Sequence, residues 1–222
     1  PIKLLDSSTI TLTMSLYEWA HYTTRKGAVK MHTLLDYDSL LPEFVNITDG
    51  KCGDNRGALH IPVPPHSVVV ADRGYCDFSL LDDWDSRNVF LMQAQGNLLY
   101  SQIEERLLPE TRAQNVLIDE IIELTGEQTK KKYTKPLRRI AVWNDEHGYV
   151  VQLLTNNFKL SASTIAQLYK ARWMIEILQK HQAAVENNDF IGTSRNAVET
   201  QIWIALSTML LLCWLKHIAK YK

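Results

Sequence analysis

Cysteine is scarce in this sequence of 222 residues, which has three such residues and no CxxC pair. A sparse, odd number of cysteines argues against a disulfide scaffold and indicates free thiols in a reducing compartment such as the cytoplasm. Cys52, His60, His66 and Cys76 could be considered as zinc ligands. Their spacing is irregular, however, whereas zinc sites usually include at least one closely spaced pair. We therefore expect no zinc site.

An excess of positive charge is also absent. The chain has 24 Lys and Arg residues against 25 Asp and Glu residues, so its net charge is -1. The overall basic character that is typical of nucleic-acid-binding proteins is missing, and any DNA contact must depend on local charge. With 45% hydrophobic and 22% charged residues, the composition is that of a folded globular protein.

Neither a signal peptide nor a long hydrophobic run is present. The most apolar segment, residues 202–215, has 14 residues, whereas a helix that crosses a bilayer needs roughly 20. We therefore expect a helix whose apolar residues between 203 and 214 pack in the core, and no membrane association. The N-terminus lacks the basic start and apolar run of a signal peptide.

Short segments rich in Thr, Ile and Val fill the first third of the chain and favour β-strands separated by turn residues. The expected strands are residues 2–12, 29–37, 41–47, 67–72 and 89–93. The first three follow one another directly, which predicts a meander. Between the last two, residues 78–85 can form a helix with Asp77 as its N-cap.

The rest of the chain divides into a polar middle and a helical end. Residues 94–150 contain several Gly and Pro residues and expected strands at 115–124 and 137–143, which indicates a β-rich insertion. Two helices should follow, one capped by Ser161 or Ser163 and one by Thr193 or Ser194. This order predicts an α/β sheet domain with an inserted subdomain, in which residues 1–93 and 151–222 form the core around the insertion.

One predicted helix face carries a mixture of functional groups. Tyr169, Arg172 and Glu176 have offsets of 0, 3 and 7, and Lys180 follows at 11, so all four share one face. An ion-pair ladder on a solvated surface is the simpler explanation. An Arg–Glu pair at i,i+4 contributes only about 0.2–0.5 kcal/mol.

Two expected strands carry carboxylates, Asp6 within the first and Asp72 at the end of the fourth. Acidic residues are depleted in strands, and a buried carboxylate is costly unless it is paired or bound to metal. Each Asp alone could be a strand-end cap or turn residue. If both converge with Glu176, their oxygens would suit Mg²⁺, or Mn²⁺ in its place. Two such ions can activate water and stabilise the leaving oxygen of a phosphodiester.

Several segments together resemble the insertion sequence 4 family of DDE transposases, in the same order and over nearly the whole chain. They are residues 5–10 (LDSSTI), 26–36 (KGAVKMHTLLD), 70–75 (VADRGY), 154–158 (LTNNF) and 169–176 (YKARWMIE). The resemblance implies a ribonuclease-H-like core, which is a mixed sheet with flanking helices, and a β-rich insertion subdomain. It also implies Mg²⁺-dependent cleavage and joining of DNA ends, with Asp6, Asp72 and Glu176 as the catalytic and metal-binding triad.

The resemblance further implies partners and a location. The partners are the double-stranded transposon end and target DNA, and two protomers pair the two ends as a homodimer. The location is the bacterial cytoplasm, in association with the nucleoid. The family's N-terminal DNA-binding region should lie outside this sequence, because the first triad residue is already Asp6.

The chain departs from the family's Y-R-E-K signature at its last letter. Tyr169, Arg172 and Glu176 match the first three letters, but Ala183 stands where the lysine is expected, and residues 179–189 differ from the family pattern. Lys180, on the same helix face, could reach a phosphate instead. Two alternatives therefore stay open: a remnant that only binds DNA or partner subunits, and a nuclease of the same fold without strand transfer.

Other basic residues could contact DNA. Lys130, Lys131, Lys132 and Arg138 belong to a segment with six cations and one aromatic residue, which could follow a phosphate backbone. A solvated loop is an equally good interpretation. Lys26 and Lys30, which flank the second expected strand, are candidates of the same kind.

Overall fold

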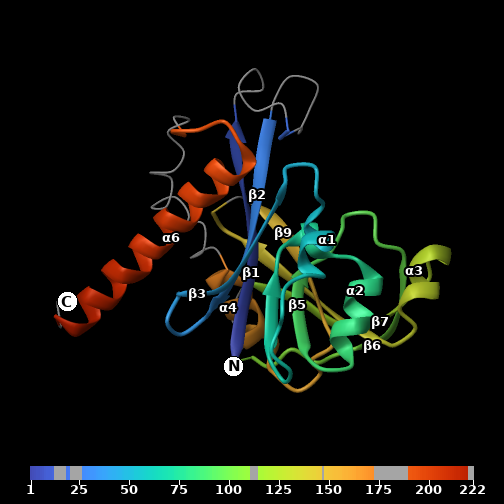
Figure 1. Cartoon of the computed structure of the whole chain (residues 1–222). Coiled ribbons are helices and arrows are strands. Elements are labelled where there is room, and N and C mark those ends of the chain that lie inside the picture. Colours follow the sequence, from blue (N-terminus) through green and yellow to red (C-terminus); the bar gives the residue numbers. More distant parts are fainter. Residues whose placement is uncertain (13–18, 21–26, 111–114, 147, 173–189, 220–222) are drawn as a thin grey trace.

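A nine-stranded mixed β-sheet forms the centre of the molecule in the computed structural model (Figure 1). The structure describes residues 1–12, 19–20, 27–110, 115–146, 148–172 and 190–219. The strands are β1 (Ile2–Leu12), β2 (Gly27–Asp36), β3 (Pro42–Asp49), β4 (Val68–Ala71), β5 (Val89–Gln93), β6 (Tyr100–Glu105), β7 (Val116–Leu124), β8 (Leu137–Asn144) and β9 (Tyr149–Thr155). The helices are α1 (Asp54–Ala58), the 3-10 turn η1 (Arg73–Tyr75), α2 (Phe78–Asp85), α3 (Glu127–Lys132), α4 (Ala162–Ala171) and α6 (Arg195–Ile218).

The strand order is β3-β2-β1-β4-β5-β9-β8-β7-β6. The expected meander is confirmed, because β1, β2 and β3 pair antiparallel with their sequence neighbours. In the centre, β1, β4 and β5 are parallel to one another, and α2 forms the crossover from β4 to β5. The remaining strands are antiparallel to their neighbours.

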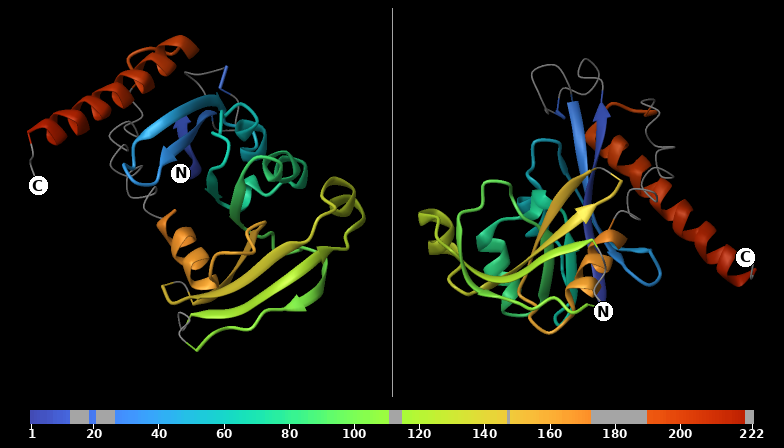
Figure 2. Two further views of the ribbon diagram at one scale, coloured as in Figure 1. Left: turned by 90° about the horizontal axis from the view of Figure 1, so that it is seen from below. Right: turned by 180° about the vertical axis from the view of Figure 1, so that it is seen from behind.

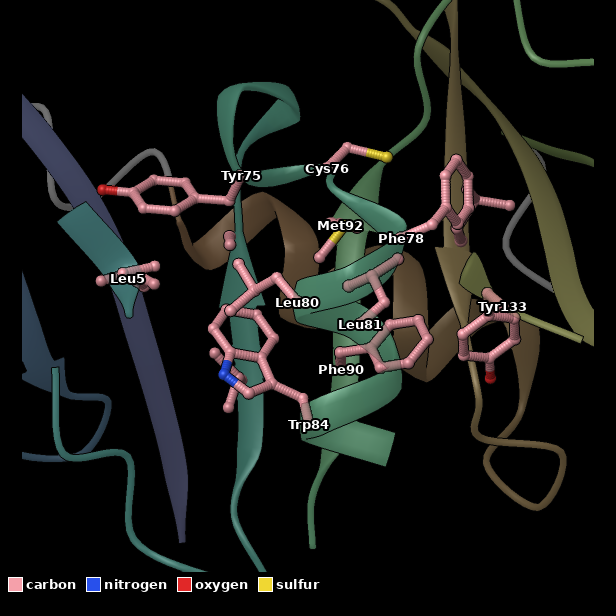
Figure 3. Close-up of a cluster of buried hydrophobic side chains, with 14 of the residues drawn as sticks. Leu5, Tyr75, Cys76, Phe78, Leu80, Leu81, Trp84, Phe90, Met92 and Tyr133 are labelled. Carbon is pink, nitrogen blue, oxygen red and sulfur yellow. The ribbon is translucent and has the colours of Figure 1, made fainter. Parts of the chain in front are cut away.

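Hydrophobic side chains cover both faces of the sheet, because successive strand residues point to opposite sides. Leu5 belongs to the cluster beneath α2, whereas Leu4 belongs to the cluster beneath α4. Figure 3 shows the α2 side, where Leu81 and Trp84 of α2 belong to one cluster of buried side chains with Phe90 of β5. Helices therefore flank both faces of a mixed sheet, as the predicted α/β fold class requires.

The sequence predicted α2 and its cap correctly. The Asp77 carboxylate accepts hydrogen bonds from the backbone N–H groups of Ser79 and Leu80, which satisfies donors that a helix start leaves unpaired. The next helix, α4, is capped in the same way by Ser161, whose hydroxyl accepts from the Thr164 N–H.

The strands between residues 94 and 150 continue the same sheet. β9 joins β5 to β8, and two buried ion pairs, Arg138 with Asp119 and Arg139 with Glu120, connect β8 to β7. The expected boundary between residues 150 and 151 falls inside β9. The division into a core and an insertion thus stays a proposal.

Helix α6 packs against the sheet by its first half alone. Val198, Ile202 and Leu206 join the cluster formed with β1 and β2, whereas Trp203 and Trp214 are 46% and 57% exposed. The expectation that residues 203–214 pack in the core is wrong, because the helix extends beyond the sheet, away from β6–β8 (Figures 1 and 2). By length and composition Arg195–Leu215 could cross a membrane, although one such helix is a weak indication.

Candidate functional site

Three polar side chains form a row across the parallel centre of the sheet. β1 pairs with β4 so that Leu5 lies opposite Ala71; the next residue of β1 is Asp6, and the residue that directly follows β4 is Asp72. β4 pairs with β5 in the register that brings Gln93 beside Asp72. The topology therefore brings together two carboxylates that are 66 positions apart in the sequence.

The row points toward helix α4. Leu4 and Val70 lie two residues before Asp6 and Asp72, and both belong to the hydrophobic cluster beneath α4. Since side chains alternate along a strand, Asp6 and Asp72 point to this same face. Asp6 is 6% exposed, while Asp72 is partly exposed.

The end of α4 contributes a phenol and a guanidinium to the row. The Tyr169 hydroxyl donates a hydrogen bond to Gln93 Oε1 at 3.1 Å. Arg172 Nη1 lies 3.8 Å from Asp6 Oδ1, and the guanidinium lies 5.5 Å from the centroid of the Tyr169 ring. The predicted common helix face of Tyr169 and Arg172 is thus directed at the strand carboxylates.

Arg172 carries its charge in a buried place. Burial opposes ionisation, but the neighbouring Tyr169, Asp6 and Asp72 together raise the pKa of Arg172 above its usual value. Burial also raises the pKa of Tyr169, which Arg172 partly offsets. At neutral pH the site therefore holds a guanidinium beside a protonated phenol, and the guanidinium is stabilised by the carboxylates.

The segment that follows β4 holds the Asp72 carboxylate in place. Asp72 Oδ1 accepts a hydrogen bond of 2.7 Å from the Gly74 N–H, which begins the 3-10 turn η1. A cavity of about 400 Å³ opens beside it, lined by Asp72, Arg73, Gln93, Ala94, Gly96, Tyr149, Val150 and Gln152. A ligand could therefore approach Asp72 from the solvent.

Three predicted site residues lie outside the described part of the chain. Glu176 and Lys180 fall within residues 173–189, and Lys26 falls within residues 21–26. Among the residues that the structure does describe, no group of three or more His, Cys, Asp and Glu side chains could hold a metal ion. The triad therefore stays a prediction, with Asp6 and Asp72 side by side.

Two predicted DNA contacts have other roles. Arg138 is 1% exposed and donates two hydrogen bonds of 2.7 Å to Asp119 and further bonds to backbone carbonyls. Arg138 is thus a structural residue of the sheet, which corrects its prediction as a DNA contact. The Lys30 ammonium lies 3.0 Å from Asp54 Oδ1 with its side chain 14% exposed, so it is committed to an ion pair.

The other basic candidates lie on the surface. Lys130, Lys131 and Lys132 belong to α3, a short exposed helix, where a solvated loop was the alternative interpretation. Lys131 pairs with Glu127 at 3.0 Å, and Lys132 lies 3.7 Å from Asp77. Exposed pairs of this kind are weak, so the ammonium groups could exchange them for a phosphate.

Sequence reasoning missed Asp54, whose carboxylate accepts hydrogen bonds from Ser7 and Lys30. It stands in a five-residue helix that shows no periodic pattern. No sequence signal could have pointed to it, because its proximity to Gly74, where a side chain would overlap the Asp54 carboxylate, arises only in the fold.

Comparisons with known proteins agree with one another. A family model described as a transposase DDE domain matches residues 1–212. A transposase of Sinorhizobium fredii is 29% identical over 217 residues, which cover 95% of this chain and 60% of that protein. A transposase for insertion sequence element IS5377 of Geobacillus stearothermophilus is 28% identical over 97% of this chain and 56% of its own length. The chain thus spans less than two thirds of these relatives.

The structural comparison supports the fold. A piggyBac transposase, solved by cryo-EM in a synaptic complex with hairpin DNA, matches 92% of this chain and 45% of its own chain, with a TM-score of 0.51 and 11% identity. At this identity the likeness concerns the fold alone. It agrees with the expected ribonuclease-H-like mixed sheet with flanking helices.

Proposed function

The chain belongs to the transposase DDE domain family, and from this premise we propose that it cleaves transposon ends and transfers the freed strands to target DNA in a metal-dependent reaction. The observation that carries the proposal is the pair of neighbouring carboxylates, Asp6 and Asp72, beneath Arg172. The reaction class is cut-and-paste transposition, which consists of phosphodiester hydrolysis followed by transesterification.

The donor set fits a hard divalent ion. Family members use divalent metal ions, and carboxylate oxygens are the ligands that Mg²⁺ and Mn²⁺ prefer. Asp6, Asp72 and Glu176 would hold Mg²⁺, with Mn²⁺ able to substitute. The bound metal would supply activation of water and stabilisation of the leaving oxygen.

The remaining residues would hold the DNA phosphates. The planar guanidinium of Arg172 offers two parallel donors that match phosphate oxygens. The hydrogen bond from Tyr169 to Gln93 holds the phenol beside Asp72. Lys26, Lys180 and the exposed Lys130, Lys131 and Lys132 would add phosphate contacts along the duplex.

The partners follow from the same reaction. Transposases bind DNA, and this protein would bind the double-stranded transposon end and the target. Pairing the two transposon ends calls for two active sites, so we propose a homodimer in the DNA complex. The protein would act in the bacterial cytoplasm at the nucleoid.

The test compares cleavage of the cognate transposon end in Mn²⁺ by the complete protein and three single variants. Asp6→Asn, Asp72→Asn and Glu176→Gln should each reduce cleavage at least about 100-fold while far-UV circular dichroism stays unchanged, because each removes a charged metal ligand. Asp83→Asn, an exposed acid on α2, is the matched control and should cleave normally. Normal cleavage by any of the three variants would remove that residue from the site.

A catalytically inactive remnant is the second candidate, and Ala183 in place of the signature lysine favours it. If the protein binds the transposon end but cuts nothing in Mn²⁺, the remnant is correct. Cleavage without transfer of a pre-cut end to a target plasmid would instead identify a nuclease of the same fold.

A further inference from the structure

A second polar cluster lies on the opposite face of the sheet, beneath α1. Ser7 Oγ donates to Asp54 Oδ1 at 2.7 Å, and the Lys30 ammonium donates to the same oxygen at 3.0 Å. The ring of His32 lies 3.9 Å from that oxygen and contacts the Tyr75 hydroxyl at 3.4 Å. His32 and Tyr75 are fully buried, whereas Ser7, Lys30 and Asp54 are partly exposed, so this cluster extends from the interior to the surface.

The cluster contacts both segments that carry the proposed metal ligands. On β1, Ser7 directly follows Asp6. After β4, Gly74 and Tyr75 belong to the 3-10 turn that Asp72 begins. Asp54 thus reaches the first segment through Ser7 and the second through Gly74.

Gly74 lies between two carboxylates. A methyl group placed on it would overlap Asp54 Oδ2 and would lie 3.1 Å from Asp72 Oδ1. The Gly74 N–H also donates to Asp72 Oδ1. One oxygen of Asp54 is therefore held by β1 and β2, while the other occupies the space beside Gly74, whose N–H orients Asp72.

The position of Asp54 is itself fixed by packing. The ring of His32 fills the space beside Gly57 of α1, where any side chain would overlap it. On its other side the ring meets Tyr75 edge to face, with centroids 6.4 Å apart. The Tyr75 ring points from the α2 cluster toward Leu5 (Figure 3), so α1, β1 and the turn pack against shared side chains.

We propose that Asp54 is a positioning residue that fixes Asp72 relative to Asp6 from behind the sheet. The inference rests on the proposed function, because it assumes that these two carboxylates bind metal. In this role Asp54 would itself bind neither the metal nor the DNA. It acts through Ser7 on β1 and through Gly74 in the turn after β4. Mutation of residues that orient metal ligands typically lowers metal affinity 10- to 100-fold.

The experiment measures Mn²⁺ affinity of the complete protein by electron paramagnetic resonance, without DNA. Asp54→Ala should weaken Mn²⁺ binding about 10-fold, and Asp54→Asn should retain most of the affinity, because an amide oxygen can still accept from Ser7 and Lys30. Ser7→Ala, a smaller change, should give an intermediate loss. Asp83→Ala on exposed α2 is the matched control and should bind normally.

Each outcome has a separate meaning. Unchanged Mn²⁺ affinity in both Asp54→Ala and Ser7→Ala would overturn the positioning role, as would an equal loss in Asp54→Asn and Asp54→Ala. The proposed function fails through a different result. It fails if the unmodified protein does not bind Mn²⁺, or if Asp72→Asn leaves its Mn²⁺ binding unchanged. If Asp54→Ala does not fold, Ser7→Ala decides the question alone.

Discussion

His32 shows how strongly its surroundings determine the charge of a single side chain. Burial, helped by Lys30 and opposed by the Asp54 carboxylate, lowers the pKa of His32 to about 4. The ring is therefore neutral at pH 7 and hydrogen-bonds Thr48 and Tyr75. A neutral ring can accept at one nitrogen and donate at the other, which suits a buried place between two hydroxyls.

This depressed pKa predicts a loss of stability in acid. The folded pKa lies below the unfolded value of about 6.5, so between pH 6.5 and 4 the unfolded chain binds a proton that the folded chain does not. The free energy of unfolding should fall by about 3 kcal/mol across this window and should be fully retained above it.

Urea denaturation of the wild type and of His32→Gln between pH 7.5 and 4 measures the effect. Glutamine does not titrate and can still contact Thr48, so the difference between the two proteins isolates His32 from Asp54, Lys30 and other ionising groups. Parallel pH profiles for the two proteins would contradict the prediction.

At this scale the sequence predicted part of the site. The offsets of Tyr169 and Arg172 on one helix face followed from helical geometry alone, and the strand positions of Asp6 and Asp72 made them candidates. The buried role of Arg138 could not be predicted, since its partner Asp119 is on another strand and a sequence pattern does not give the register that pairs them.

Among the elements, the helices α2 and α6 show that apolar composition and burial are separate properties. In α2, Trp84 is 2% exposed inside the largest cluster. Its counterpart Trp203 on α6 is nearly half exposed, although the surrounding segment is more apolar. Which face a helix buries depends on where it crosses the sheet, and the sequence does not give that position.

The two tryptophans therefore predict different mutational costs. Trp84→Ala should lower the free energy of unfolding by about 3–5 kcal/mol, because it removes buried area and leaves a cavity. Trp203→Ala should cost less than about 1 kcal/mol, since much of its ring is already in contact with water. Urea denaturation at pH 7.5 measures both values, and equal losses would contradict the assigned packing of α2 and α6.

Strand prediction succeeded where apolar residues form a compact run and failed where polar residues dominate. The centre of the sheet was recognised because β4 and β5 consist of consecutive apolar residues between turn signals. β6, with its Glu-rich sequence, and the five- and six-residue helices α1 and α3 carry no such periodicity. Contacts with neighbouring elements stabilise β6, α1 and α3 in the fold.

For the molecule as a whole, one continuous sheet links the carboxylates of β1 and β4 to the strands beyond β5. The resemblance of this chain to a transposase family predicted the ribonuclease-H-like mixed sheet, whereas the pattern of residues alone predicted only an α/β sheet domain with an insertion. The joining of β6–β9 to the same sheet depends on the pairing of β5 with β9, which involves three residue pairs far apart in the sequence.

A metal bound to the folded state should stabilise the whole molecule. At a free Mn²⁺ concentration 100 times the Kd, the free energy of unfolding should rise by about 2.7 kcal/mol. Urea denaturation with Mn²⁺ and with EDTA measures this gain. Asp72→Asn should abolish it and Asp83→Asn should retain it, whereas an equal gain in Asp72→Asn would place the metal elsewhere.

Adjacent residues of β1 serve opposite sides of the sheet: Asp6 faces α4, and Ser7 faces α1. After deletion or insertion of one residue near the start of β1, the strand could still form its backbone hydrogen bonds. Every later side chain of the strand would, however, point to the opposite face of the sheet. The Asp6 carboxylate would then point to the α1 side of the sheet, where the Ser7 hydroxyl now lies. Along β1, the count of residues is therefore as strict a requirement as their identity.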